Sequence, residues 1–171
     1  NDVTAEEYLE MIRLKTAVLL AASLKIGARL GGASVEDADR LYDFGMHIGV
    51  AFQLKDDLLD VYGNAKVFGK NIGGDILCNK KTYMLIKALE HANADQHNQL
   101  NSWINAETFQ PAEKIAAVTE LYDRIGVKAV CENKILEYSN RAMESLAAVS
   151  IAEEKKEELK KIIENLIHRE V

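Results

Sequence analysis

Three aspartates lie close together in the stretch FQLKDDLLD, residues 52–60. Residues three and four apart share one face of an α-helix, so Gln53, Asp56 or Asp57, and Asp60 would form a single polar strip. Neighbouring carboxylates repel one another, and in a partly buried setting they take up protons unless a cation compensates their charge. Oxygen ligands on a rigid helix suit a hard cation such as Mg²⁺, which keeps several waters and shares its remaining coordination with phosphates.

Lysines accompany these acids. The stretch leads into GNAKVFGKNIGGD, residues 63–75, a loop whose four glycines allow unusual backbone angles. Lys70 lies in this loop, Lys80 follows it, and Lys15 precedes it beside Thr16. Taken alone, DDLLD equally suits a solvated helix face, and each lysine suits the surface. Carboxylates for a metal together with lysines for an anion predict a metal-bridged phosphate site.

The bulk composition narrows the class of protein. The chain has 171 residues, 48% of them hydrophobic and only one a proline, which is enough for one compact domain over residues 1–171. A net charge of -6 with mixed signs offers no basic surface to a nucleic-acid backbone. No apolar run approaches the roughly 20 residues that span a bilayer, so we expect no membrane span. Two cysteines without a CxxC pair favour neither a disulfide framework nor a zinc site, and fit a cytoplasmic protein.

The first part of the chain carries strong helix signals. Thr4 and Glu7 form a capping box, and apolar residues then recur with a helical period up to a cluster of glycines. Ser34 repeats the cap signature before a second long helix, which contains FQLKDDLLD and ends at the glycine-rich loop. Within that helix, we expect Gly45 and Gly49 to permit close helix packing rather than catalysis.

Helical signals continue beyond the loop. We expect helices to resume near Asn79, to restart behind Pro111 as a first-turn residue, and to break at Gly126. Ser150 is expected to cap a final charged helix. Alternating strand patterns are almost absent, so the sequence predicts an all-α array of long helices.

Three motifs together resemble a known family. FQLKDDLLD, followed by FGKNIGGDILCNKKT and preceded by IRLKTAVLLAASLKIGA, is similar to the C-terminal half of a trans-isoprenyl diphosphate synthase, also called a polyprenyl synthetase. The motifs occur in the family's order over about residues 4–90, and beyond them only the helical character agrees. The resemblance implies an isoprenoid-synthase-like helical bundle, of which this chain would be an incomplete, C-terminal half.

The resemblance also implies a reaction. An allylic prenyl diphosphate would be ionised with the help of Mg²⁺, and the carbocation would be attacked by the double bond of isopentenyl diphosphate in a head-to-tail (1'-4) condensation. The aspartates match the family's second aspartate-rich motif, with Asp56 as the direct metal ligand and with Asp57 and Asp60 acting largely through metal-bound water.

The other matched positions would contact the substrates. Lys15, Lys70 and Lys80 would bind the leaving diphosphate and stabilise the charge that develops on it. Thr16 and Gln53 match groups whose oxygens face the allylic cation. The aromatic residue Phe52 matches the one beside the isopentenyl site.

The chain departs from the family pattern in several respects. The family places two aspartate-rich motifs across a cavity, whereas this chain has one DDxxD. The basic residues that hold isopentenyl diphosphate, and the helices that usually form the homodimer interface of the full-length protein, are also missing. The chain begins at Asn1 rather than Met, so we expect a fragment that is inactive in elongation by itself.

Two other readings remain open. A class I terpene cyclase shares the fold and a DDxxD, but it pairs that motif with a downstream Asn/Ser/Glu metal triad, whereas DDLLD here precedes the lysine-bearing loop GKNIGGD. A non-catalytic helical subunit could also keep the fold. Loss of acids or lysines would be expected in such a subunit, yet every matching position in this half is filled.

Overall fold

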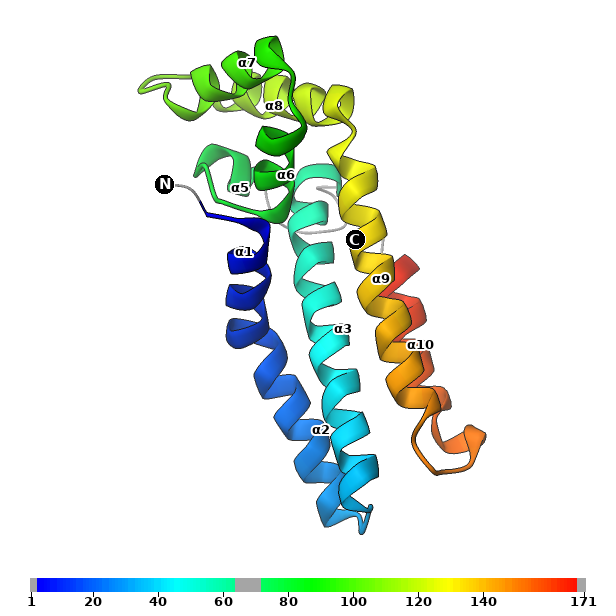
Figure 1. Cartoon of the computed structure of the whole chain (residues 1–171). Helices are drawn as coiled ribbons and strands as arrows, with labels where there is room; N and C mark the ends of the chain where they lie inside the picture. The colour runs from blue at the N-terminus through cyan, green and yellow to red at the C-terminus, as the bar shows by residue number, and fades with distance from the viewer. Residues whose placement is uncertain (1–2, 64–71, 169–171) are drawn as a thin grey trace. The chain divides into compact units, whose positions relative to one another are not determined.

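The computed structural model describes residues 3–63 and 72–168. Every regular element in these two ranges is helical and none is a strand, so the expected all-α fold is confirmed there (Figure 1). The residues divide by their mutual contacts into two compact units. Of the described residues, the first unit comprises residues 3–8, 56–63 and 72–132, and the second comprises residues 9–55 and 133–168. The single domain over residues 1–171 stays a prediction.

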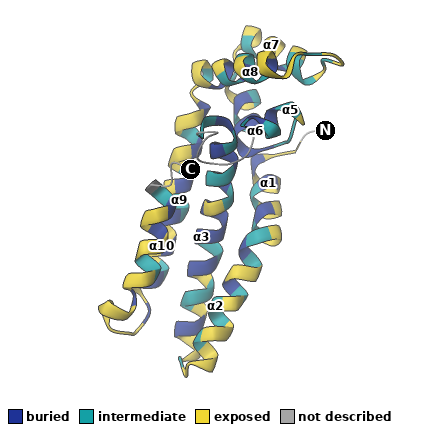
Figure 2. Cartoon of the chain, turned by 180° about the vertical axis from the view of Figure 1, so that it is seen from behind, coloured by how far each residue is buried: buried dark blue, intermediate teal, exposed yellow. Residues whose placement is uncertain are grey.

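The second unit is built from long helices. They are the end of α1 (Ala5–Ile12), α2 (Val18–Leu30), most of α3 (Val35–Tyr62), most of α9 (Val127–Ala147) and α10 (Glu157–His168). Apolar side chains at helical spacing form its core, among them Phe44, Ile48 and Leu54 on α3 and Ile163 and Leu166 on α10. These buried stretches are dark blue in Figure 2.

The capping residues act as expected in both long N-terminal helices. The Thr4 amide donates to Glu7 Oε2 at 2.8 Å and the Glu7 amide donates to Thr4 Oγ1 at 3.1 Å, which completes the capping box. Ser34 Oγ accepts a hydrogen bond from the Asp37 amide at 3.0 Å at the start of α3. These hydrogen bonds confirm the two predicted caps. Both could be predicted because they join residues only three positions apart in the sequence.

A π turn over Arg13–Ala17 interrupts the first helical stretch between α1 and α2. The sequence predicts one continuous helix here, because the apolar period of the flanking residues does not reveal one extra residue within a turn. Single π turns occur often at functional sites. This turn contains Lys15 and Thr16, two of the predicted site residues.

Two glycines of α3 lie against the first helical stretch of the second unit. A Cβ atom on Gly49 would lie 2.6 Å from Ala17 Cα, and a Cβ atom on Gly45 would lie 2.6 Å from Ala21 Cα. Both distances are far below van der Waals contact, so only glycine allows the two backbones to approach this closely. The expected packing role of the pair is confirmed.

The first unit is an array of shorter helices. They are α5 (Gly74–Leu77), α6 (Tyr83–His91), α7 (Ala94–Ile104) and α8 (Pro111–Ile125), with the end of α3 and the start of α9. Helix α8 packs against α5, α6 and α7. Pro111 opens α8 and Gly126, with φ of 84°, ends it, as the sequence predicts. Buried Val118, Leu121 and Tyr122 on α8 face this core.

Two helix boundaries differ from expectation in the first unit. Helix α6 begins at Tyr83, with Thr82 as its cap, and not near Asn79. Asn79 instead has a left-handed backbone, with φ of 50°, just after the short helix α5. A further break separates α6 from α7, where Asn93 and Gln96 form a capping box. Local polar side chains compete with the helical hydrogen bonds at each of these points.

The final helix also begins later than expected. Ser150 does not cap it, since its amide donates to Asp37 Oδ1 at 2.9 Å within the second unit. A 3₁₀ turn over Glu153–Lys155 follows, and α10 starts at Glu157. The buried Lys156 explains the turn, because its ammonium group donates to Ala147 O at 3.0 Å and to Glu153 Oε1 at 2.9 Å.

Substitution of Gly49 by alanine should destabilise the chain by about 1–3 kcal/mol, because the added methyl group would force apart two packed backbones. Gly27→Ala is the matched control, since nothing lies within 4 Å of the Cβ position and the residue lies inside α2. The control should gain about 0.5–1 kcal/mol in helix stability. Urea unfolding followed by circular dichroism measures both changes, and a Gly49→Ala chain as stable as the wild type would contradict the packing role.

The stability that the turn before α10 gives to the fold should depend on pH. Hydrogen bonds from Lys160 and Lys156, both at 2.9 Å, lower the pKa of Glu153 from 4.5 to about 2. A carboxylate with a lowered pKa stabilises the fold above its unfolded pKa, and this contribution is lost as the pH falls through the folded pKa. Glu153→Gln should therefore lower the Tm at pH 7, and the difference from wild type should close between pH 4.5 and 2. Glu154→Gln should show no such difference.

Candidate functional site

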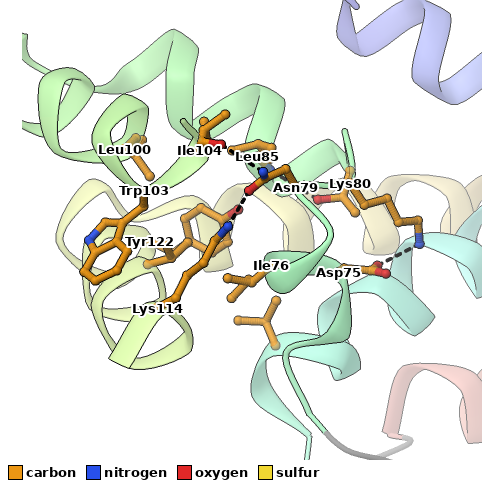
Figure 3. A pocket seen from close by; sticks show the side chains of 13 residues that line it. Asp75, Ile76, Asn79, Lys80, Leu85, Leu100, Trp103, Ile104, Lys114 and Tyr122 are labelled. Atoms are coloured by element: carbon orange, nitrogen blue, oxygen red, sulfur yellow. Dashed lines mark hydrogen bonds and ion pairs between the residues drawn. The ribbon is translucent and has the colours of Figure 1, made fainter. Parts of the chain in front are cut away.

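Acidic side chains gather in the first unit, where α3 ends and α5 begins. Asp57 is 2% exposed, and its Oδ1 accepts a hydrogen bond from Lys80 Nζ at 2.9 Å. Its Oδ2 accepts a hydrogen bond from the hydroxyl group of the buried Tyr8. The same lysine ammonium reaches Asp75 Oδ2 at 2.7 Å (Figure 3). Lys80 therefore lies between two carboxylates that come from different helices.

Asp60 connects the same two helices through the backbone. Its Oδ2 accepts the Asp75 amide hydrogen at 2.9 Å, and its carbonyl oxygen accepts the Gly73 amide hydrogen at 2.6 Å. Gly73 has φ of 85° and caps α5, a conformation that suits glycine. The start of α5 is thus fixed to the last turn of α3, which places Asp75 beside the aspartates of DDLLD.

Burial and charge determine the protonation of this cluster. Burial raises the pKa of Asp57 to about 6, although the Lys80 ammonium opposes this rise. Burial raises the pKa of Asp60 as well. Burial alone would lower the pKa of Lys80, but the Asp75 and Asp57 carboxylates outweigh it and raise that pKa to about 12. Lys80 therefore stays charged, while Asp57 and Asp60, whose pKa values are raised by burial, lose their protons less readily than a free carboxyl group does.

Asp56 differs from its neighbours. It is half-buried on α3, and no described residue forms a hydrogen bond or ion pair with its carboxylate. Across residues 3–63 and 72–168, no three His, Cys, Asp or Glu side chains lie close enough together to hold a metal ion by themselves. Carboxylate oxygens are nevertheless the ligand type that Mg²⁺ prefers, so the chemistry of the cluster fits this ion.

The second unit holds four of the predicted residues, Lys15, Thr16, Phe52 and Gln53. Thr16, in the π turn, donates a hydrogen bond from Oγ1 to Gln53 Oε1 on α3 at 3.2 Å. Lys15 is exposed in the same turn. Phe52 is 43% exposed and lines an apolar groove of about 330 Å³ together with residues of α2, α3 and α10. Thr16 and Gln53, distant in sequence, are thus brought into contact within one unit.

The predicted residues are distributed unevenly. Asp57 and Lys80 contact each other in the first unit, Thr16 and Gln53 contact each other in the second, and Lys70 lies outside the described residues. Sequence reasoning missed Tyr8 as a partner of Asp57. A tyrosine among the apolar positions of an amphipathic helix was its only local signal, because a buried hydroxyl group needs a partner.

The chain matches relatives over nearly all of its length. It is 37% identical over 169 residues to a short chain isoprenyl diphosphate synthase of Methanothermobacter thermautotrophicus, which covers 99% of this chain and 51% of that protein. It is 31% identical to a (2E,6E)-farnesyl diphosphate synthase of Mycobacterium bovis, over 99% of this chain and 48% of the relative. The chain therefore spans about half the length of the curated relatives it matches.

Solved structures agree with the fold. A crystal structure of a geranylgeranyl pyrophosphate synthase superimposes with a TM-score of 0.91 at 35% identity, over 100% of this chain and 53% of that one. Another, from Corynebacterium glutamicum and complexed with isoprenyl diphosphate and magnesium, has a TM-score of 0.87 at 31% identity, over 99% of this chain and 48% of that one. The similarity thus extends well beyond residues 4–90, where the motifs lie, and confirms the isoprenoid-synthase-like fold.

None of the helices in the described residues is both long and apolar enough to cross a bilayer.

Residues 1–122 match the family described as Polyprenyl synthetase. This match covers most of the chain, including DDLLD, Lys80 and the π turn that carries Lys15. The chain belongs to the polyprenyl synthetase family.

Proposed function

We propose that the protein of which this chain is a part is a trans-isoprenyl diphosphate synthase. It joins isopentenyl diphosphate to an allylic prenyl diphosphate in a head-to-tail (1'-4) condensation, depends on Mg²⁺, and works as a homodimer in the cytoplasm. The observation that carries this proposal is the position of Lys80, whose ammonium group lies 2.9 Å from Asp57 and 2.7 Å from Asp75. In that arrangement, carboxylates that can bind a metal lie beside an ammonium group that can bind an anion.

The aspartates would hold Mg²⁺ in two ways. Asp56 is the direct ligand, since no described side chain engages its carboxylate. Asp57 and Asp60 act through metal-bound water, because Lys80, Tyr8 and the Asp75 amide already donate hydrogen bonds to their oxygens. Water and diphosphate oxygens would supply the remaining ligands that this ion usually takes. Bound Mg²⁺ would neutralise the diphosphate and so make it a better leaving group.

The lysines would stabilise the departing diphosphate. When the allylic C–O bond breaks, the electron pair leaves with the diphosphate oxygen, and negative charge builds up there. Lys80 would donate hydrogen bonds to that oxygen and its neighbours, and we propose the same role for Lys15 and Lys70. The raised pKa of Lys80, about 12, keeps its ammonium group charged for this role at neutral pH.

The remaining residues would act on the carbocation. The oxygens of Thr16 and Gln53, which lie 3.2 Å apart, face the positive carbon and stabilise it electrostatically. The double bond of isopentenyl diphosphate forms the new C–C bond, and loss of one proton leaves a chain five carbons longer. Phe52 packs against the isopentenyl unit, which its place on an apolar groove supports.

Asp56→Ala should weaken binding of pyrophosphate in the presence of Mg²⁺ about tenfold or more, because a direct metal ligand is lost. Isothermal titration of the chain with pyrophosphate at fixed Mg²⁺ measures this change. Asp43→Ala is the matched control, since Asp43 is an exposed carboxylate on the same helix, and it should bind like the wild type. Equal titration curves for wild type and Asp56→Ala would contradict the metal role.

The 171-residue chain by itself should not elongate an allylic diphosphate, because it carries one of the two aspartate-rich motifs. The assay incubates the chain with Mg²⁺, isopentenyl diphosphate and an allylic diphosphate, and follows the radiolabelled prenyl product. A full-length synthase assayed in parallel provides the positive control. Measurable turnover by the chain would show that half of the metal ligands suffice.

A further inference from the structure

A buried lysine on α8 has no carboxylate partner among the described residues. Lys114 is 1% exposed, and its ammonium group donates to Asn79 Oδ1 at 2.7 Å and lies 4.2 Å from the centre of the Phe109 ring. Burial lowers the pKa of Lys114. Burying an ammonium group against an amide and a ring is costly, and an apolar side chain would fill the space at less cost. The contact with Asn79 therefore calls for a reason beyond packing.

Asn79 is the turning point of the chain between α5 and Lys80. Its φ of 50° is left-handed, its amide donates to Ile76 O at 3.2 Å, and the Lys80 amide donates to Asp75 O at 2.9 Å. These two bonds are the Schellman motif that ends many helices, usually with glycine at the left-handed position. Asparagine tolerates this conformation and adds a side chain that glycine lacks.

The Asn79 side chain is held from both sides. Its Nδ2 donates to Ile104 O, at the end of α7, at 2.9 Å, while its Oδ1 accepts from Lys114 on α8. Figure 3 shows both bonds together with the Lys80–Asp75 ion pair. A lysine can only donate and a carbonyl oxygen can only accept, so the orientation of the amide is determined. The backbone that leads into Lys80 is thereby fastened to two helices of the first unit.

We propose that Lys114 is a positioning residue that acts through Asn79 to hold the Lys80 ammonium group in place. The inference rests on the proposed function, in which Lys80 binds diphosphate. Lys80 leaves the Asn79 turn and must reach both Asp57 and Asp75. A fixed turn removes conformational freedom that Lys80 would otherwise lose when diphosphate binds, so binding is stronger.

A control on the same helix distinguishes the proposed positioning role of Lys114 from a purely structural role. Val118 lies one turn further along α8, is 5% exposed, and lines the same small cavity as Lys114 and Asn79. Val118→Ala removes packing from this region without touching the Asn79 side chain. It should lower the stability of the chain but leave its affinity for pyrophosphate unchanged.

The test titrates the full chain with pyrophosphate at fixed Mg²⁺. Lys80→Met should weaken binding about tenfold or more, as expected for loss of a charge-assisted hydrogen bond. Lys114→Met should weaken pyrophosphate binding about three- to tenfold, because Lys80 would remain but would be held less firmly. The double variant should bind like Lys80→Met alone, because Lys114 acts only through Lys80. Unchanged binding in Lys114→Met, equal weakening in Val118→Ala, or additive losses in the double variant would each overturn the proposal.

A second variant covers the case in which Lys114→Met does not fold. Asn79→Gly keeps the left-handed turn accessible but removes both side-chain hydrogen bonds, so it should reproduce the loss of affinity. Amide hydrogen exchange gives a measurement without any ligand. Exchange at the Lys80 amide, relative to the Ile86 amide in the core of the same unit, should accelerate in Lys114→Met and Asn79→Gly and not in Val118→Ala.

The measurements distinguish a failure of the proposed function from a failure of the positioning role of Lys114. If the wild-type chain binds no pyrophosphate, diphosphate binding by this chain is contradicted, and the exchange rates alone decide whether Lys114 positions Lys80. Faster exchange at Lys80 in the Lys114 and Asn79 variants would then support the positioning role. Unchanged exchange in both variants would overturn it.

Discussion

The first unit depends on one electrostatic constraint, the compensation of a buried carboxylate. Asp57 lies at 2% exposure, and an unpaired charge there would be strongly unfavourable. Lys80 and Tyr8 supply the hydrogen bonds that make this burial tolerable. Their positions in turn require the short helix α5 and the Asn79 turn, because Lys80 must emerge beside α3. The local architecture between residues 72 and 83 follows from this requirement.

Lys80 and Tyr8 do not offset the whole effect of burial on the acids of this cluster. Burial keeps the pKa of Asp57 at about 6 even with Lys80 beside it, and it also raises the pKa of Asp60. Among the described residues near this cluster, Asp57, Asp60 and Asp75 supply carboxylates and Lys80 supplies the ammonium group. A hard cation such as Mg²⁺, as proposed above, would lower the cost of ionising the buried acids.

Glycine and asparagine have specific tasks in positioning these groups. Gly49 allows α3 to approach Ala17 in the π turn, next to the residues that form the Thr16–Gln53 contact in the second unit. Gly73 caps α5 in a left-handed conformation, with Ile115 of α8 directly against it. Asn79 uses the same conformational freedom at the other end of α5, but its amide also binds Lys114 and Ile104. Each residue places the backbone beside a side chain of the proposed site.

The sequence by itself determined the elements whose signals are local. The caps at Thr4 and Ser34, the ends of α8 and the aspartate spacing could be predicted, because each depends on residues three or four positions apart. Only the tertiary structure decided which aspartate is buried, since Tyr8 and Lys80 lie 49 and 23 residues from Asp57. The π turn and the Lys114–Asn79 contact also could not be predicted. They arise from packing and from hydrogen bonds between distant residues, which no local pattern encodes.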